Sequence, residues 1–178
     1  MIKDLDSKGF KSIVDQYDLF FIDLWGVVHN GIELFQNSIN VLEEISNLGK
    51  EYVLLTNAPR PNSDVISFLG KMGLKAETSS NVYTSGEAAL NYLTKNYKDK
   101  KFFHIGPPRD FSLFNNFKKN KSNKIDASDF LLCTGLFDEF DKELIYYEKI
   151  FKNYINKNMV CTNPDLIVDR GEVREYCA

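Results

Sequence analysis

The stretch FFIDLWGVVHNG, residues 20–31, decides the fold class of this chain. It begins with a short apolar run, rich in aromatic and β-branched residues, that carries one carboxylate at Asp23 and breaks at Gly26. Such a run predicts a strand buried on both faces of a parallel sheet. Asp23 then lies at the carboxyl end of that strand, the edge where open α/β sheets bind ligands. The alternative interpretation is an acid that only caps a loop by accepting local main-chain N–H groups.

A second strand is predicted to end beside the first. Apolar residues at helical spacing over 39–48 are followed by a second apolar run at 51–55, which ends in Thr56 and Asn57. A strand, a helix and a strand in this order form a crossover that makes the two strands parallel. We therefore expect Thr56 and Asn57 at the same sheet edge as Asp23.

The remaining pattern continues the α/β alternation. A polar stretch over 96–101 predicts a domain boundary, with a second small α/β unit beyond it and no further strong helix or strand after Asp165. Before the boundary, the other expected elements are a short helix capped by Asp6 or Ser7 and running to about Gln16, a helix from about Asn62, a weak strand over 79–83, and a helix after the capping-box sequence Thr84–Glu87. Beyond it, we expect strands over 102–105, 130–135 and 159–162, helices over 111–117 and 141–155, and a solvated loop over 118–124.

Composition excludes several classes of function. The chain has 178 residues, 43% of them apolar, and a net charge of -3 with both signs interspersed, which offers no footprint for nucleic acid. No stretch approaches the ~20 apolar residues that span a membrane, and the first residues lack the apolar core of a signal peptide. Cys133, Cys161 and Cys177 show no metal-ligand or disulfide spacing, so a reducing, cytoplasmic location is expected.

Asp23, Thr56 and Asn57 together suggest group-transfer chemistry. A carboxylate can carry a phosphoryl or alkyl group covalently, which divides one difficult step into two easier ones. The hydroxyl and the amide are suited to hold the oxygens of the transferred group. A hard cation such as Mg²⁺ also prefers carboxylate and carbonyl oxygens, so this edge favours a divalent metal.

Four motifs in this order resemble the haloacid dehalogenase superfamily, and specifically the sugar-phosphatase and 4-nitrophenylphosphatase-like enzymes of its subfamily IIA. The motifs are FIDLWGV at 21–27, LLTNAPR at 54–60, YTSG at 83–86 and TNPD at 162–165. The resemblance implies a Rossmann-like parallel-sheet core over residues 1–97 and an inserted α/β cap domain over 98–178. It also implies a Mg²⁺-dependent phosphatase that acts on a small phosphorylated metabolite of the sugar-phosphate class through an aspartyl-phosphate.

The resemblance carries roles over to individual residues. Asp23 matches the nucleophile and, with the main-chain carbonyl of Trp25, the metal ligands. Thr56 and Asn57 match the phosphate-binding motif, and Arg60 matches a basic substrate-binding position just beyond it. Residues 163–165 match the signature of the cap.

Two departures from the family pattern bear on activity. Where phosphatases of the superfamily place a second Asp, which protonates the leaving oxygen, this chain has Trp25, as in one group within the subfamily. General acid catalysis worth ~10²–10⁴-fold must then come from another group, and His29 is the nearest titratable candidate. The family's later Lys and Gly-Asp motifs have no match after Asp165, so we expect an amino-terminal portion of a longer protein, inactive as it stands.

Two further functions stay open beside the phosphatase. A dehalogenase also carries an aromatic residue two places after its nucleophile, because a halide leaves without a proton. A non-catalytic pseudo-phosphatase that binds a ligand or a partner suits the loss of the acid. The cysteines are interpreted as small core residues and His104 as either a packed or a solvated side chain. The Tyr146–Tyr147 pair serves either cap packing or a homodimer contact.

Overall fold

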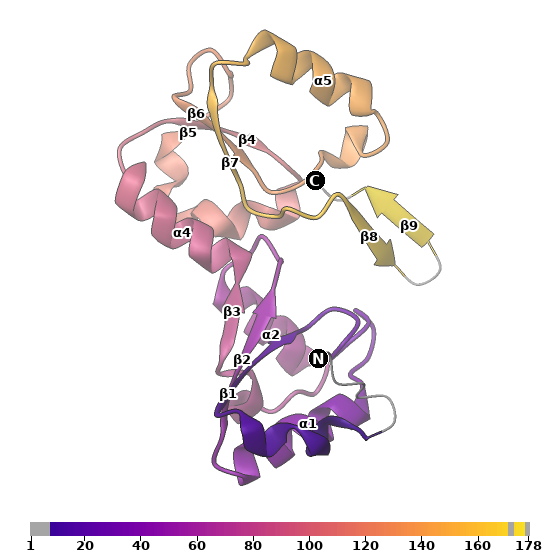
Figure 1. Cartoon of the computed structure of the whole chain (residues 1–178). Coiled ribbons are helices and arrows are strands. Elements are labelled where there is room, and N and C mark those ends of the chain that lie inside the picture. The colour runs from indigo at the N-terminus through magenta and orange to yellow at the C-terminus, as the bar shows by residue number, and fades with distance from the viewer. Residues whose placement is uncertain (1–7, 171–172, 177–178) are drawn as a thin grey trace. The chain divides into compact units, whose positions relative to one another are not determined.

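The computed structural model describes residues 8–170 and 173–176, which fall into two compact units. The first unit contains the described residues up to Thr56 together with Ile66–Tyr83. The second contains Asn57–Val65 and the described residues from Thr84 onward. Each unit has its own sheet (Figure 1). The division into a core over 1–97 and a cap over 98–178 stays a prediction.

The first unit is built on a three-stranded sheet of order β1-β2-β3. Its strands are β1 (Leu19–Asp23), β2 (Glu51–Thr56) and β3 (Val82–Thr84). β1 and β2 are parallel and in register from Leu19 beside Glu51 to Asp23 beside Leu55. Helix α1 (Gln36–Asn47) lies between them in sequence and buries Leu42 and Ile45. The predicted strand-helix-strand unit is confirmed.

The prediction that β1 is buried on both faces is wrong. Phe20 is buried, but Leu19 and Phe21 are 43% and 67% exposed. Successive side chains of a strand point to opposite faces, so one face of β1 packs inward and the other lies open. In the described part of the chain β1 is also the last strand of its sheet, with β2 as its only neighbour.

Two of the predicted helices form, but their predicted caps form only in part. α2 (Asn62–Lys71) and α4 (Ser85–Asn96) form as predicted, and the Thr84 hydroxyl accepts the Glu87 N–H at 2.8 Å. The Glu87 carboxylate accepts from the Asn62 N–H at 3.1 Å, so the expected capping box is only half formed. A short helix, α3 (Ala76–Ser79), replaces the start of the weak strand.

The amino-terminal helix is also different. Two 3₁₀ turns, η1 (Phe10–Ser12) and η2 (Val14–Gln16), stand where one helix was expected. The proposed caps, Asp6 and Ser7, lie outside the described residues.

The second unit has a parallel four-stranded sheet of order β5-β4-β6-β7. Its strands are β4 (Phe102–Ile105), β5 (Lys121–Ser122), β6 (Phe130–Cys133) and β7 (Asn158–Cys161), and its helices besides α4 are η3 (Pro108–Asn120), η4 (Asp138–Phe140) and α5 (Leu144–Asn153). All four residues of β6 are buried. Phe102, Phe114 and Phe130 are among the largest buried side chains of its core.

Three local predictions in this unit need correction. The expected helix over 111–117 is a 3₁₀ segment with non-helical dihedral angles at Phe114 and Phe117. The expected solvated loop over 118–124 contains β5, and the Lys121 ammonium lies 4.1 Å from the centre of the Phe111 ring, a cation–π contact. Tyr147 is buried and its hydroxyl accepts the Phe137 N–H at 2.7 Å, so this tyrosine serves packing within the unit.

The chain also continues beyond the cap signature as an antiparallel hairpin of β8 (Ile167–Arg170) and β9 (Val173–Tyr176). The expectation of no further strand was wrong. Each strand is four residues long and β9 is wholly exposed, so it gives no apolar run for a sequence pattern to detect. Among the described residues, no helix is long and apolar enough to cross a membrane.

Gly86 is a position where the fold requires the absence of a side chain. It is buried in the first turn of α4, its N–H donates to the Ala58 carbonyl at 3.0 Å, and a Cβ atom there would overlap the main chain of Arg60. We expect Gly86→Ala to lower the free energy of unfolding by about 1–3 kcal/mol in urea denaturation, because main-chain atoms cannot yield as a flexible side chain does.

The matched control is Gly70→Ala in α2, where nothing lies within 4 Å of the added atom. Alanine favours helix there, so stability should rise by up to about 1 kcal/mol. Equal effects of the two substitutions would contradict the close approach at Gly86.

Candidate functional site

Asp23 and Thr56 end neighbouring strands at one edge of the first sheet. Asp23 is exposed and is the register partner of Leu55, so Thr56 follows one residue beyond it on β2. The Leu24 N–H donates to the Leu55 carbonyl at 3.2 Å and continues the ladder past the strand end. The structure therefore brings these two predicted site residues to the same edge, as their strand pattern indicates.

The loop after Asp23 folds back on the Leu24 main chain. The Leu24 carbonyl accepts the N–H groups of Val28 at 2.8 Å and His29 at 3.1 Å. Gly26 has a φ of +75° and donates its N–H to the His29 carbonyl at 2.8 Å. A left-handed backbone is costly for residues with a side chain, which explains the glycine at the point where the apolar run breaks.

Trp25 uses its side chain to build this loop. Its indole covers Gly31, where a Cβ atom would lie 2.6 Å from the ring and where φ is +88°. The indole also meets the His29 ring edge to face, with centroids 5.4 Å apart. Trp25 stands where the family resemblance implies a second Asp. Its side chain therefore packs the loop at that position.

His29 is buried beneath the same loop. It is 4% exposed, its Nδ1 accepts the Gly31 N–H at 2.9 Å, and its ring lies 5.7 Å from that of Phe68. Burial lowers the pKa of His29, and the Asp23 carboxylate opposes that shift only in part. The ring is thus neutral near pH 7 with its proton on Nε2, which makes it a weak proton donor at that pH.

The donors at this edge fit a hard cation only as part of its coordination shell. Asp23 offers an exposed carboxylate, and the main-chain oxygen of Trp25 was predicted as a second ligand. In the described ranges no three His, Cys, Asp or Glu side chains gather to hold a metal ion. Mg²⁺ is commonly held by one or two carboxylates with water and substrate phosphate, so this donor set suits it.

Asn57 lies in the second unit with the segment that follows β7. Its amide Nδ2 donates to the Asp165 carboxylate at 2.9 Å, and the Asp165 N–H donates to the Asn163 side chain at 3.0 Å. The Ser85 hydroxyl donates to the Thr162 carbonyl in the same region. Sequence reasoning singled out Asn57 and residues 163–165 as separate motifs but did not predict that they touch.

Arg60 belongs to a buried polar network that the sequence did not reveal. Its Nε lies 3.2 Å from Asp110, whose side chain is only 3% exposed. Thr134 hydrogen-bonds Asp110 and, at 2.8 Å, the Nε2 of buried His104. Burial raises the pKa of Asp110 against the opposing Arg60 charge, and it lowers the pKa of His104 to about 4.

Sequence reasoning missed Asp110 and Thr134 for a physical reason. Asp110 lies in a 3₁₀ segment with no helical repeat, and Thr134 directly follows β6. The one available signal was the run Gly106–Pro107–Pro108 after a buried strand. Gly106 has a φ of +147°, and a side chain there would overlap Thr134 and His104.

The family model for haloacid dehalogenase-like hydrolases matches residues 20–118, which is more than half of the chain. The chain belongs to this family. It is 32% identical to phosphoglycolate phosphatase 2 of Arabidopsis thaliana over 105 residues, which are 57% of this chain and 35% of that protein. It is 26% identical to the 4-nitrophenylphosphatase of Schizosaccharomyces pombe over 111 residues, 60% of this chain and 37% of that one. The chain thus spans little more than a third of these relatives.

Solved structures share the fold over most of the chain. A haloacid dehalogenase-like hydrolase from Brucella suis superposes with a TM-score of 0.82 and 27% identity, over 94% of this chain and 64% of that one. The 4-nitrophenylphosphatase of Thermotoga maritima superposes with a TM-score of 0.70 and 22% identity, over 93% and 62%. The predicted α/β fold with parallel sheets is therefore confirmed, and it matches the fold of subfamily IIA structures over most of the chain.

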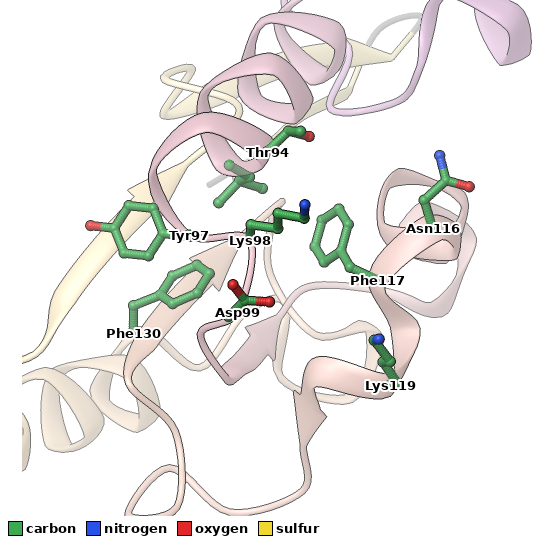
Figure 2. A pocket seen from close by; sticks show the side chains of 9 residues that line it. Thr94, Tyr97, Lys98, Asp99, Asn116, Phe117, Lys119 and Phe130 are labelled. Carbon is green, nitrogen blue, oxygen red and sulfur yellow. The ribbon is translucent and has the colours of Figure 1, made fainter.

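A hollow in the second unit stands apart from the predicted site residues. It has a volume of about 220 Å³ and lies beside the end of α4 and η3 (Figure 2). Tyr97, Phe117 and Phe130 line it with aromatic rings, and Lys98 and Lys119 line it as well (Figure 2). None of the six predicted site residues lines it.

The Arg60–Asp110 pair should contribute to stability because one partner is buried. We expect Arg60→Gln to lower the free energy of unfolding by about 2 kcal/mol, because it leaves the Asp110 carboxylate buried without its charge partner. The matched control is Lys152→Gln, which breaks an exposed pair with Glu148 and should cost less than about 0.5 kcal/mol. Urea unfolding of both variants measures these changes. Equal losses of unfolding free energy would refute the role of burial.

The pH dependence of stability should carry the signature of His104. Its pKa is lowered to about 4 in the folded protein from 6.5, so the unfolded chain binds the proton first as pH falls. Stability is therefore full above pH 6.5 and falls by up to about 3 kcal/mol as the pH approaches 4. Urea unfolding between pH 7.5 and 4 measures this loss.

The control is His104→Gln, which should show a shallower loss over the same range. The raised pKa of Asp110 acts in the opposite direction, and comparison of the two proteins cancels it. A His104 imidazole resonance that titrates near pH 6.5 in the folded protein would overturn the prediction.

Proposed function

We propose that this chain carries the nucleophile-bearing part of a Mg²⁺-dependent phosphatase for a small phosphorylated metabolite. The observation that carries the proposal is Asp23, exposed at the carboxyl end of β1 and in register one residue before Thr56. Family membership supports hydrolase chemistry at this strand end. The names of the relatives, phosphoglycolate phosphatase and 4-nitrophenylphosphatase, support a phosphate monoester as the substrate class.

Asp23 is proposed as a covalent carrier of the phosphoryl group. One carboxylate oxygen attacks phosphorus, the ester P–O bond breaks, and the alcohol leaves with a proton. Water then attacks the aspartyl-phosphate, which releases inorganic phosphate and restores the carboxylate. This division into two steps is the advantage of a carboxylate nucleophile.

Thr56 and Asn57 are proposed to hold the phosphate oxygens, and Arg60 to hold the substrate beyond them. Asp23 and the main-chain oxygen of Trp25 would hold Mg²⁺, which neutralises charge on the phosphate when bound. Asp110 keeps the Arg60 guanidinium in one orientation through its contact with Nε. A planar guanidinium fixed in this way recognises an anionic oxygen with less loss of side-chain freedom.

The leaving alcohol needs a proton. The indole of Trp25 cannot supply it. His29 is the proposed donor, and its lowered pKa means that its cationic form is populated only at acid pH. We therefore expect turnover to rise as pH falls below 6.5 if His29 supplies this proton.

Two alternatives rest on Trp25. A dehalogenase needs no proton for its leaving halide, so an aromatic residue at position 25 suits it. A pseudo-phosphatase would bind a phosphorylated ligand without turnover. The chain spans only part of its relatives, so the activity, the cap role of residues 98–178 and the substrate are proposals for the whole protein.

The test is phosphate release by the full gene product with Mg²⁺, from phosphoglycolate, glycerol phosphate and 4-nitrophenyl phosphate. We expect activity that falls by at least about 10³-fold in Asp23→Asn, because the amide is not a nucleophile. The control is Asp18→Asn, which changes an exposed acid outside β1 and should leave activity unchanged.

Each other outcome selects a different function. Halide release from a 2-haloacid without metal would support the dehalogenase. Ligand binding without either activity would support the pseudo-phosphatase. Activity that survives in Asp23→Asn would overturn the proposed nucleophile.

A further inference from the structure

Cys133 and Cys161 are register partners on two neighbouring parallel strands of the second unit. Cys133 ends β6 and Cys161 ends β7. Neighbouring strands lie about 4.8 Å apart, which falls within the Cα separation that a disulfide spans. Register partners also point their side chains to the same face of the sheet. The strand pairing thus places two thiols side by side, which their 28-residue separation in sequence does not suggest.

The two thiols have different surroundings. Cys133 is 6% exposed, whereas Cys161 lies on the last strand of the sheet order and is exposed. The expectation that both are packed core residues therefore holds for Cys133 and is wrong for Cys161; Cys177 lies outside the described residues. A thiol-reactive molecule in solution therefore meets Cys161 before Cys133.

The contact between the thiols also makes them unequal as acids. A hydrogen bond from the Cys133 thiol lowers the pKa of Cys161, while the same contact and burial raise the pKa of Cys133. The thiolate is the reactive form of cysteine. The exposed member of the pair is thus also the one that loses its proton more readily.

We propose that Cys133 and Cys161 form a site of reversible oxidation, in which a low-molecular-weight disulfide such as oxidised glutathione converts the pair to a disulfide between β6 and β7. This inference does not depend on the proposed phosphatase function. It gives Cys161 the role of the attacking thiol and Cys133 that of the resolving thiol.

The exchange balances in two steps. The Cys161 thiolate attacks one sulfur of oxidised glutathione, breaks its S–S bond and releases one glutathione thiolate, which takes up a proton. Cys133 then loses its proton and attacks the Cys161 sulfur, which forms the protein disulfide and releases the second glutathione. Two protein thiols are oxidised to one disulfide, and one glutathione disulfide is reduced to two thiols.

Oxidation would reach the segment that contacts Asn57. The Cys161 thiol donates to the Asn163 carbonyl at 3.1 Å, and this donor is lost in the disulfide. The N–H and hydroxyl of Thr162 both donate to the Cys133 carbonyl, at 2.9 Å and 3.2 Å. We therefore expect oxidation of the pair to change the main-chain contacts just before Asp165, whose carboxylate accepts the hydrogen bond from Asn57.

The experiment equilibrates the 178-residue protein with glutathione buffers from fully reduced to fully oxidised at pH 7.5. Free thiols are trapped with N-ethylmaleimide after an acid quench, and the peptides are identified by mass spectrometry. We expect a peptide pair that joins Cys133 to Cys161, reversed by dithiothreitol. The unmodified protein carries this test, so it does not depend on whether a variant folds.

Variants then assign the order of the steps. Cys133→Ser should accumulate glutathione on Cys161, because no thiol resolves the mixed disulfide. Cys161→Ser should leave Cys133 reduced, because it is buried. Cys177→Ser is the matched control and should still form the Cys133–Cys161 link.

Three results would overturn the proposal. They are a wild-type protein whose thiols both stay reduced in oxidised glutathione, a wild-type protein that stops at glutathione on Cys161, and a disulfide that joins Cys161 to Cys177 instead.

Discussion

The parallel register of β1 against β2 is the constraint on which the first unit depends. With Asp23 beside Leu55, the Leu24 N–H reaches the Leu55 carbonyl and the following loop starts at a fixed point. A slip of one residue would exchange the two faces of β1. Phe20 would then lie on the exposed face of the sheet, and Asp23 would lie on the buried face. The same few main-chain hydrogen bonds thus hold the core and present the carboxylate.

The segment 57–65, which follows the end of β2, is held by the second unit. The contacts that hold it there include Asn57 to Asp165, the Arg60 side chain to Asp110, and the Arg60 carbonyl to the Thr84 hydroxyl. Two of these contacts join residues 108 and 50 positions apart. The motif that begins at Thr56 is therefore shared, because its first residue ends a strand of one unit and its later residues pack in the other.

The sequence predicted the elements with a strong apolar repeat and failed where structure rests on polar or short-range features. β2, β4, β6 and α4 were found because buried residues set their periodicity. β5 and the hairpin after Asp165 were missed because two-residue or exposed strands bury too little to leave a pattern. Asp23 and Thr56 were placed correctly at one edge because parallel pairing follows from a crossover. The Arg60–Asp110–Thr134–His104 network was not predictable, since its members come from four separate segments.

The packing of Trp25 on Gly31 limits which substitutions the loop can accept singly. Gly31 adopts a left-handed backbone under the indole, and His29 meets the edge of the same ring. Replacement of Trp25 by an acid would remove the ring that covers Gly31 and meets His29, so a gain of proton-transfer chemistry would come with lost packing in the loop. Because these three side chains share contacts, we expect the effects of substitutions at 25, 29 and 31 on stability to be non-additive.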